Sequence, residues 1–133
     1  MHRTKGVQVD TNSINRAIAE IIFTALNNRD LSLLDKYLDE HATFDFPGTT
    51  LIRGRKKIII FFKILFRKYS RLTFTVKETI VEGEGVCVLW TNQGSTSNGH
   101  AYSNRGVTFV HITDGKILFL SDYFKDTSFA EPG

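Results

Sequence analysis

The sequence predicts an α+β fold in a single domain, with three helices ahead of an antiparallel sheet. In the first half of the chain, apolar residues recur at the three- and four-residue spacing of helices. The last third, residues 86–126, reads as three long strands joined at Asn98-Gly99 and Asp114-Gly115, which are strong signals for tight hairpin turns. A chain of 133 residues suffices for one domain with a hydrophobic core and is too short for two. Helices packed on one face of the sheet are the arrangement expected for this order of elements.

The three helices are predicted at residues 14–27, 31–38 and 55–69. The first follows the N-cap candidates Thr11-Asn12-Ser13. The third is apolar on nearly all sides, so we expect it to be buried or to lie at an interface. Residues 1–12 are predicted to form a flexible tail, and residues 13–130 the folded domain.

The strands begin with a short segment at residues 41–46, which Pro47-Gly48 ends. Residues 73–82 alternate apolar and polar side chains, as a half-buried strand does. Gly83-Glu84-Gly85 then turns the chain into the three strands of the last third. The predicted sheet therefore contains four consecutive antiparallel strands and one short strand from earlier in the chain.

The charge of the chain is mild, with a formal net charge of +3 and no run of five basic residues. The basic residues Arg53, Arg55, Lys56 and Lys57 resemble the solvated start of a helix, so nucleic acid is not an expected partner. The longest apolar run, residues 58–66, is interrupted by a lysine and is too short to cross a bilayer. No membrane association is predicted.

The cysteine and histidine content excludes several kinds of site. Cys87 is the single cysteine, so no intrachain disulfide can form and no cysteine-based metal site is indicated. The four histidines lack the spacing of metal ligands. Neither a metal nor another cofactor is predicted. Residues 1–12 lack the apolar stretch of a signal peptide, and a cytoplasmic location is expected.

Several short stretches resemble one known superfamily. They are residues 24–31, the segment Thr43-Phe44-Asp45-Phe46-Pro47, the triplet Ile52-Arg53-Gly54 and the ending Ser121-Asp122-Tyr123-Phe124-Lys125-Asp126. Together they resemble the nuclear transport factor 2-like (NTF2-like) superfamily, and within it the SnoaL-like, ketosteroid-isomerase-related group, over residues 14–128. The resemblance implies a cystatin-like cone, in which a strongly bent sheet wraps around the three helices and leaves a pocket at its open end. It does not imply one reaction, because this fold hosts many functions.

The hairpin turns predict which strand residues share a face of the sheet. If both are two-residue loops, Asn92 faces Arg105 and Val107 faces Asp122. The family resemblance places the aspartate of an Asp-Tyr-Phe-x-Asp ending in the pocket, so the face that carries Asp122 is expected to be concave. The members predicted for this face are Val88, Trp90, Asn92, Arg105, Val107, Phe109, Leu118, Leu120, Asp122 and Phe124.

This arrangement predicts a site with Asp122, Arg105 and Asn92 as catalytic candidates. The predicted ligand-binding residues are Trp90, Phe44, Phe46, Phe124 and Val107. A guanidinium beside Asp122 is expected to keep this carboxylate ionised. The alternative remains that Arg105 and Asp122 form a purely structural ion pair.

The residues that the resemblance assigns to known chemistries are incomplete here. At the ketosteroid isomerase positions, Phe46 replaces the base, Ile22 replaces the tyrosine, and the second aspartate falls at Val107 or Thr108. The epoxide hydrolase pattern matches at Asp122 only, because Trp90 and Asn92 occupy its other positions. A metal-free isomerase, cyclase or hydratase with Asp122 as acid or base stays open. The alternative is a non-catalytic ligand-binding or dimeric interaction module.

The opposite, convex face is predicted to form a homodimer. It is expected to carry a contiguous apolar patch, which is too large to leave in water. In this superfamily the convex face commonly makes a homodimer. The residues predicted for this interface are Leu89, Val110, Ile117, Phe119 and Tyr123.

Overall fold

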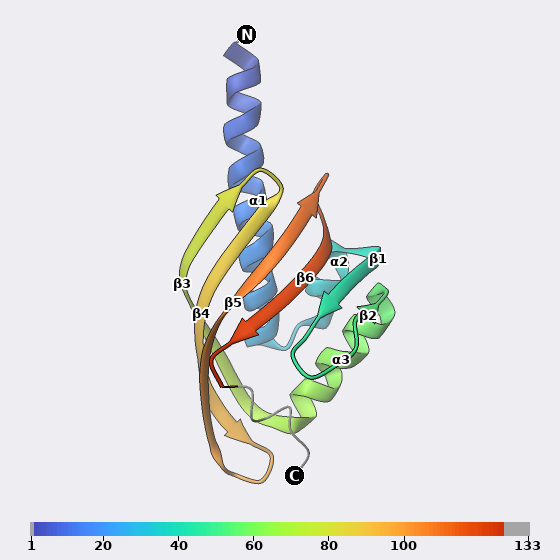
Figure 1. The fold of residues 1–133 in the computed structure, drawn as a ribbon, viewed down its shortest axis with the longest axis vertical. Helices are drawn as coiled ribbons and strands as arrows, with labels where there is room; N and C mark the ends of the chain where they lie inside the picture. Colours follow the sequence, from blue (N-terminus) through green and yellow to red (C-terminus); the bar gives the residue numbers. More distant parts are fainter. Residues whose placement is uncertain (1, 127–133) are drawn as a thin grey trace.

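The computed structural model describes residues 2–126, with side chains from residue 11 onward. Figure 1 shows the chain order, which is two helices, two short strands, a third helix and four long strands. The elements are α1 (His2–Asn28), α2 (Leu31–Tyr37), β1 (Leu38–Asp45), β2 (Ile52–Arg53), α3 (Arg55–Lys68), β3 (Tyr69–Glu82), β4 (Gly85–Thr96), β5 (Ala101–Thr113) and β6 (Lys116–Phe124). The predicted α+β class and the three helices are therefore confirmed.

One sheet contains all six strands, in the order β2-β1-β6-β5-β4-β3. Strand β1 runs parallel to β6, whereas the other neighbours are antiparallel. The sheet is thus mixed, and the prediction of a wholly antiparallel sheet was wrong at this one pair. The reason is that β1 and β6 are separated in the chain by α3 and four strands, so no hairpin turn dictates their relative direction.

The long strands bend strongly, and the apolar core lies on the concave side, against the helices. The register between β3 and β4 shifts at Tyr69/Arg71 and again at Val76/Glu78. Near the first shift β4 passes so close to β3 that a Cβ atom at Gly94 would lie 1.9 Å from the carbonyl oxygen of Arg71. Only glycine fits there, because the clash is with backbone rather than with a side chain that can rotate away.

Helix α1 lies behind the sheet in Figure 1 and is bound to β3, the last strand of the sheet. The side-chain amide of Asn27 pairs with the backbone of Phe74 as a residue of a neighbouring strand would. Its Nδ2 donates to the Phe74 carbonyl (2.9 Å), and its Oδ1 accepts from the Phe74 N–H (2.7 Å). Further along, Arg16 donates to the Thr79 carbonyl (2.7 Å), and Glu20 accepts from the Thr79 hydroxyl (2.6 Å). These contacts satisfy backbone groups of β3 that have no neighbouring strand.

The start of α1 differs from the expected one. The helix begins at His2 rather than at residue 14, so residues 2–12 are helical, and Figure 1 shows this end projecting beyond the sheet. The N-cap candidates at residues 11–13 lie inside the helix. Because no proline interrupts residues 2–13, a helix anchored by its packed C-terminal half can extend backwards at little cost.

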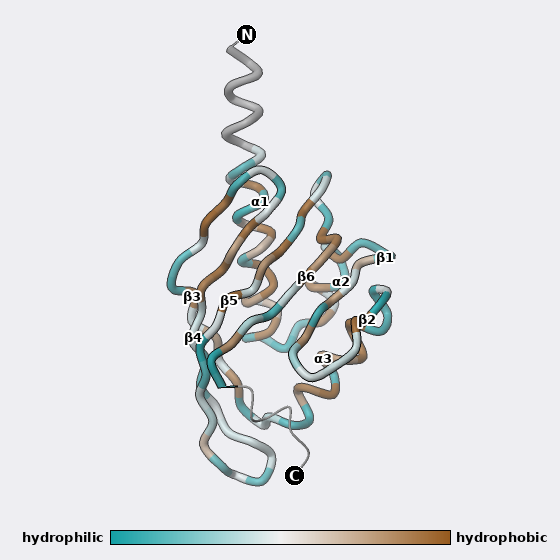
Figure 2. The backbone as a smooth tube through the Cα atoms, in the orientation of Figure 1, coloured by the Kyte–Doolittle hydropathy of each residue, from teal (hydrophilic) through white to brown (hydrophobic). Residues whose placement is uncertain are grey.

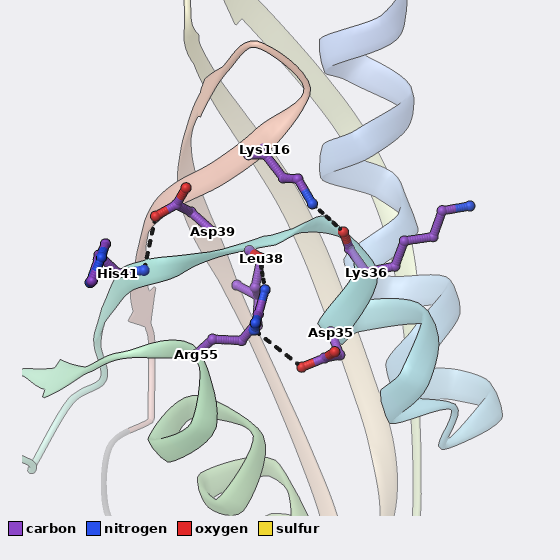
Figure 3. Close-up of polar contacts among 7 residues, drawn as sticks. All are labelled: Asp35, Lys36, Leu38, Asp39, His41, Arg55 and Lys116. Atoms are coloured by element: carbon purple, nitrogen blue, oxygen red, sulfur yellow. Dashed lines mark hydrogen bonds and ion pairs between the residues drawn. The ribbon is translucent and has the colours of Figure 1, made fainter.

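Polar contacts fasten α2, β1 and α3 to one another (Figure 3). The Arg55 guanidinium forms an ion pair with Asp35 (3.5 Å) and donates to the Leu38 carbonyl (3.3 Å). From the β6 side, the Lys116 ammonium donates to the carbonyl of Lys36 (2.8 Å). The N-terminus of α2 is capped by Asp30, whose carboxylate accepts from the N–H of Leu33 (3.2 Å).

The hairpin registers differ from prediction at two places. Between β4 and β5 the chain turns through three residues, 97–99, because the N–H of Thr96 donates to the carbonyl of His100 (2.8 Å). Between β5 and β6 the tight turn holds, with Thr113 opposite Lys116, but a bulge at Leu118 shifts the pairing by one residue. The two offsets cancel, so the side chains of β4 and of most of β6 point to their predicted faces. The side chains of β5 point to the face opposite to the predicted one, and we call β5 reversed in this sense.

The reversal of β5 and the bulge move several residues between the two faces. Thr108, Val110 and Ile112 point into the fold and are buried. Ile117 is also fully buried, ahead of the bulge. Val110 and Ile117 therefore belong to the core, and their predicted place on the dimer face was wrong. Figure 2 shows that the apolar residues of β4 and β5 are concentrated in the upper half of these strands, whereas the lower ends are pale or hydrophilic. No helix within residues 2–126 is long and apolar enough to cross a membrane.

The Asn27 contact predicts a measurable stability loss. Asn27→Ala removes two hydrogen bonds to the backbone of β3, and we expect a decrease in the free energy of unfolding of about 1–2 kcal/mol. Urea unfolding monitored by circular dichroism measures it. Asn28→Ala, at the exposed neighbouring position, is the control and should leave stability nearly unchanged. Because alanine favours helix more than asparagine does, helix propensity alone cannot lower stability, and equal losses for both variants would refute a specific role of the Asn27 contact.

Candidate functional site

A central cavity lies between the helices and the concave face of the sheet. Aromatic and aliphatic side chains form most of its wall. The lining residues are Ile22, Phe23, Leu26, Phe44, Phe46, Phe62, Leu65, Tyr69, Leu72, Phe74, Trp90, Asn92, Tyr102, Thr108, Leu120, Asp122 and Phe124. The space open to the centre of a water-sized sphere is about 40 Å³, which is room for about three water molecules.

Aromatic rings from four strands or their flanking residues form a connected part of this wall. Phe46 lies 5.5 Å from Phe124, and Trp90 lies 6.0 Å from Phe124 and 5.1 Å from Phe74, measured between ring centroids. These separations and tilts are those of favourable aromatic pairs. The predicted ring residues Phe44, Phe46, Trp90 and Phe124 all line the cavity.

A chain of two hydrogen bonds crosses three strands and ends at Asp122. The indole N–H of Trp90 donates to the Thr108 hydroxyl (2.9 Å), and this hydroxyl donates to Asp122 Oδ1 (2.7 Å). The direction is fixed because an indole N–H can only donate, which leaves the hydroxyl hydrogen for the carboxylate. The other oxygen, Oδ2, has no hydrogen-bond partner among the described residues, and it is where a proton would sit in the acid form.

The surroundings of Asp122 favour its neutral form. Burial in the apolar wall raises the pKa of this carboxyl to about 7, although the Thr108 hydrogen bond acts in the opposite direction. Near neutral pH, Asp122 is therefore divided between acid and base forms. The prediction that a neighbouring guanidinium keeps it ionised was wrong, because Arg105 is not beside it.

Asn92 lies on the same wall, from β4. Its side chain is 8% exposed, and Asn92 Oδ1 is buried without a hydrogen-bond partner among the described residues. A buried amide oxygen left in this state costs on the order of 1–3 kcal/mol. Such an unpaired group in a cavity wall is a candidate contact for a polar atom of a ligand.

Two tyrosines form another part of the wall. The rings of Tyr69 and Tyr102 lie 4.7 Å apart, and Asn104 donates to the Tyr102 hydroxyl (3.0 Å). Burial raises the pKa of both phenols, and the adjacent Tyr102 contributes further at Tyr69. Both phenols are therefore neutral in the working pH range and offer hydroxyl groups rather than charge.

Arg105 and Val107 lie outside the cavity, contrary to prediction. Both are on the reversed strand β5, where Arg105 is opposite Thr91 and its side chain is exposed. The residue between them, Gly106, faces inward, and a Cβ atom there would lie 2.9 Å from the Trp90 ring and 2.4 Å from the Tyr123 carbonyl. Gly106 thus leaves the space that Trp90 occupies.

The cavity also contains residues that were not predicted from the sequence, namely Thr108, both tyrosines and the apolar residues from α1 and α3. From the sequence, the second isomerase position falls at Val107 or Thr108, and the cavity contains Thr108. The signal that could have identified it is Ser97-Asn98-Gly99, which also fits a three-residue hairpin loop with glycine at the left-handed position (φ 87°). Within the described residues, no group of three or more His, Cys, Asp or Glu is placed to hold a metal ion.

The chain belongs to the SnoaL-like domain family. The family description matches residues 19–119, which is well over half of the sequence. This agrees with the bent sheet and the cavity on its concave side. No protein of curated function matches the sequence.

Solved structures share the fold at low sequence identity. A provisionally assigned SnoaL-like polyketide cyclase from Jannaschia sp. CCS1 has a TM-score of 0.78 and 19% identity, covering 86% of this chain and 87% of that chain. An NTF2-like protein of unknown function from Burkholderia pseudomallei K96243 has a TM-score of 0.78 and 20% identity, covering 84% and 91%. TerC, crystallised with polyporic acid, has a TM-score of 0.79 and 17% identity, covering 87% and 95%. These likenesses establish the fold alone.

The raised pKa of Asp122 predicts a specific pH dependence of stability. Between pH 4 and 7 the folded protein retains a proton that the unfolded chain has lost, so stability falls as the pH rises through this range. Asp122→Asn removes the titration and keeps an acceptor for Thr108. We expect the variant to match the wild type near pH 4 and to exceed it by about 2–3 kcal/mol at pH 8, less than the full three-unit shift because Asp122 is only half-buried.

Urea unfolding at pH 4.5, 6 and 8 measures this difference. Asp45→Asn, at an exposed position of β1, is the matched control and should follow the wild type at every pH. If the Asp122→Asn and wild-type curves stay parallel from pH 4.5 to 8, Asp122 does not titrate near neutrality.

Proposed function

We propose that the chain binds a small, flat, largely apolar molecule in the central cavity and that Asp122 transfers a proton to or from it. The observation that carries this proposal is a carboxyl group with a pKa of about 7 in an apolar wall, with one oxygen held by Thr108 and the other without a hydrogen-bond partner among residues 11–126. A group that titrates near the working pH is the most effective general acid or base. Its position in a concave site supports the assignment.

The proposed reaction is an isomerase-, cyclase- or hydratase-like step on a carbonyl compound. Asp122 takes a proton from the carbon next to the carbonyl, and the electron pair of that C–H bond moves to form an enolate. In an isomerisation the proton then returns to another atom of the ligand. In a cyclisation the enolate carbon attacks a second carbonyl of the ligand, and the alkoxide that forms takes the proton. In a dehydration, the reverse of hydration, the proton leaves with the departing hydroxide as water, so none of these steps needs an oxidant or reductant. The Asn92 amide lies on the same wall, and its unpaired Oδ1 can accept a hydrogen bond from a hydroxyl group of the ligand.

The shape of the cavity supports a flat ligand and also constrains its binding. Aromatic rings on several sides suit a planar molecule. The present space of about 40 Å³ is far below the 300–1,000 Å³ typical of small-molecule sites, so side chains must move when a ligand binds. Leu65, Phe74, Tyr102 and Phe124 are half-buried, so they have more freedom to move than the fully buried residues of the wall.

The neighbouring structures agree with this class of ligand. One carries the name of a SnoaL-like polyketide cyclase, and TerC was crystallised with polyporic acid. Their identity to this chain is below 20%, so they support the ligand class and not a particular substrate.

We also propose a cytoplasmic location, supported by the single, unpaired cysteine.

Exchange of carbon-bound hydrogen in D₂O tests the proposed chemistry. With 2-tetralone as probe, a bicyclic ketone with acidic C–H groups, we expect the protein to accelerate exchange, with a rate that rises up to about pH 7 and then levels off. Asp122→Asn should slow the protein-dependent exchange by about 100-fold or more. Thr108→Val should move the midpoint of the pH profile upward, because the hydrogen bond that favours the ionised carboxylate is lost.

Two controls make the result decisive. Arg105→Ala changes a residue outside the cavity and should exchange at the wild-type rate. Fluorescence of Trp90, the single tryptophan, reports separately whether the probe enters the cavity. Binding with no dependence of exchange on Asp122 would contradict the proton-transfer role while leaving a ligand-binding module.

The small size of the cavity favours a second candidate function, a non-catalytic interaction module.

For either function we propose a homodimer through the convex face. The convex patch on this face consists of Ile80, Cys87, Leu89, Val107, Phe109, Phe119 and Tyr123. Tyr123 is 63% exposed and Ile80 is 52% exposed, while the others are half-buried. A continuous apolar surface of this kind is typical of protein interfaces.

The dimer proposal predicts a change in mass on a single substitution. Phe119→Glu places a charge in the convex patch, and light scattering at micromolar concentration should show a dimer for the wild type and a monomer for the variant. Leu51→Glu, at an exposed aliphatic residue outside the patch, should remain dimeric. A monomeric wild type would refute the interface.

A further inference from the structure

The basic residues of the chain are concentrated in one segment. Residues 46–77 contain nine of the 17 Lys and Arg and none of the 14 Asp and Glu, so this segment carries +9 while the remainder carries −6. The net charge of +3 conceals this separation. Helix α3, at the lower right of Figure 1, forms the centre of the basic segment.

One face of α3 presents these charges to solvent together with two aliphatic side chains. Lys56, Lys63 and Arg67 are exposed, and so are Ile60 (54%) and Ile64 (56%). Their three- and four-residue spacing places them on one side of the helix. The opposite side of α3 packs into the core through Ile58 and Phe62. We call the exposed set, with Lys57, the outer face of α3.

The part of the chain that the structure describes does not neutralise the charge on this face. Arg55 pairs with Asp35, as Figure 3 shows, and is therefore set apart from it. Among residues 11–126, Lys56, Lys57, Lys63 and Arg67 form no ion pair with an acidic side chain. Helix α3 itself contains no Asp or Glu. A cluster of this sign repels itself and attracts anionic partners.

A shallow apolar hollow adjoins the outer face of α3. It is lined by Phe46, Pro47, Gly48, Thr49, Phe61, Ile64, Leu65 and Lys68, and it measures about 190 Å³ on the same scale as the central cavity. Ile64 therefore belongs both to the exposed face and to the rim of the hollow. This combination offers an apolar chain a place to lie directly beside the cations.

We propose that the outer face of α3 docks on an anionic lipid surface. The Lys and Arg side chains bind headgroup phosphates, each contributing about 1 kcal/mol near such a surface. Ile60 and Ile64 insert between the first carbons of the acyl chains, as the apolar residues of interfacial helices do. A nucleic acid could engage the same cations, but it would gain nothing from two exposed isoleucines at the centre of the face. This proposal is independent of the reaction assigned to Asp122.

Sedimentation with vesicles tests the docking. The full chain should bind vesicles of phosphatidylcholine and phosphatidylglycerol (3:1) in 50 mM salt, bind phosphatidylcholine alone far more weakly, and lose affinity in 500 mM salt. Lys63→Glu/Arg67→Glu should lower the partition coefficient by at least about 20-fold, since each cation contributes a factor of about five. Lys77→Glu/Lys125→Glu makes the same change in net charge at two exposed positions away from the outer face of α3, one in β3 and one directly after β6, and should stay within about threefold of wild type.

A second double variant separates a lipid surface from other polyanions. Ile60→Ser/Ile64→Ser keeps every charge, and we expect about a tenfold loss of vesicle binding with unchanged urea stability, because both side chains are exposed. Vesicle binding by this variant at the wild-type level would overturn the lipid assignment. Tighter binding of the wild-type chain to a 20-base DNA oligonucleotide than to vesicles at equal phosphate would also overturn it and would indicate a nucleic-acid surface. Equal binding of the wild-type chain to neutral and anionic vesicles would also refute the proposal, and so would no binding to anionic vesicles. If the wild-type chain self-associates and the isoleucine variant does not, the outer face of α3 binds a second copy of the chain and not a lipid surface.

Discussion

The core and the candidate site both depend on which residues of β5 face the helices. Gly106, Thr108 and Val110 face them, and each has a different structural role. Gly106 leaves room for the Trp90 ring, Thr108 links this ring to Asp122, and Val110 fills the core beneath. Because side chains alternate strictly along a strand, no one of these positions can change face without the other two. The cavity wall is thus specified as a unit.

Asp122 represents a conflict between stability and chemistry within this unit. Burial raises its pKa to about 7, so the folded protein above neutral pH holds a carboxylate in a poorly solvated place. The fold offsets part of this cost with one hydrogen bond from Thr108, whose hydroxyl is itself oriented by Trp90. A structural ion pair would have held the carboxylate ionised. The observed arrangement instead leaves a group able to exchange a proton, at the expense of stability.

The sequence was sufficient for the fold but only partly for the site. Helix spacing, two turn signals and the family resemblance predicted the elements and the bent sheet, and they placed Asp122, Asn92, Trp90 and three phenylalanines on the concave face. The position of Arg105 could not be predicted, because it depended on one residue of loop length and on one bulge. Residues 117–120 are all apolar, and β5 has apolar side chains on both faces, so the hydrophobic pattern suits either register. The basic charge of α3 can be read from the sequence, but the proposed lipid docking also depends on two exposed isoleucines, and their exposure is known only from the structure.

The three-residue loop and the bulge at Leu118 also restrict how this chain can change in length. Each shifts the pairing by one residue, and together they restore the facing of β4 and β6 around a reversed β5. Deleting one residue from the loop alone would turn Thr108 outward and Arg105 inward, which would break the link to Asp122. A deletion in the loop matched by removal of the bulge would bring the facing of β4 and β6 back into agreement but would still leave Thr108 outward and Arg105 inward. Among relatives of this chain, the lengths of the two hairpins should therefore be inherited unchanged wherever the Trp90–Thr108–Asp122 arrangement is kept.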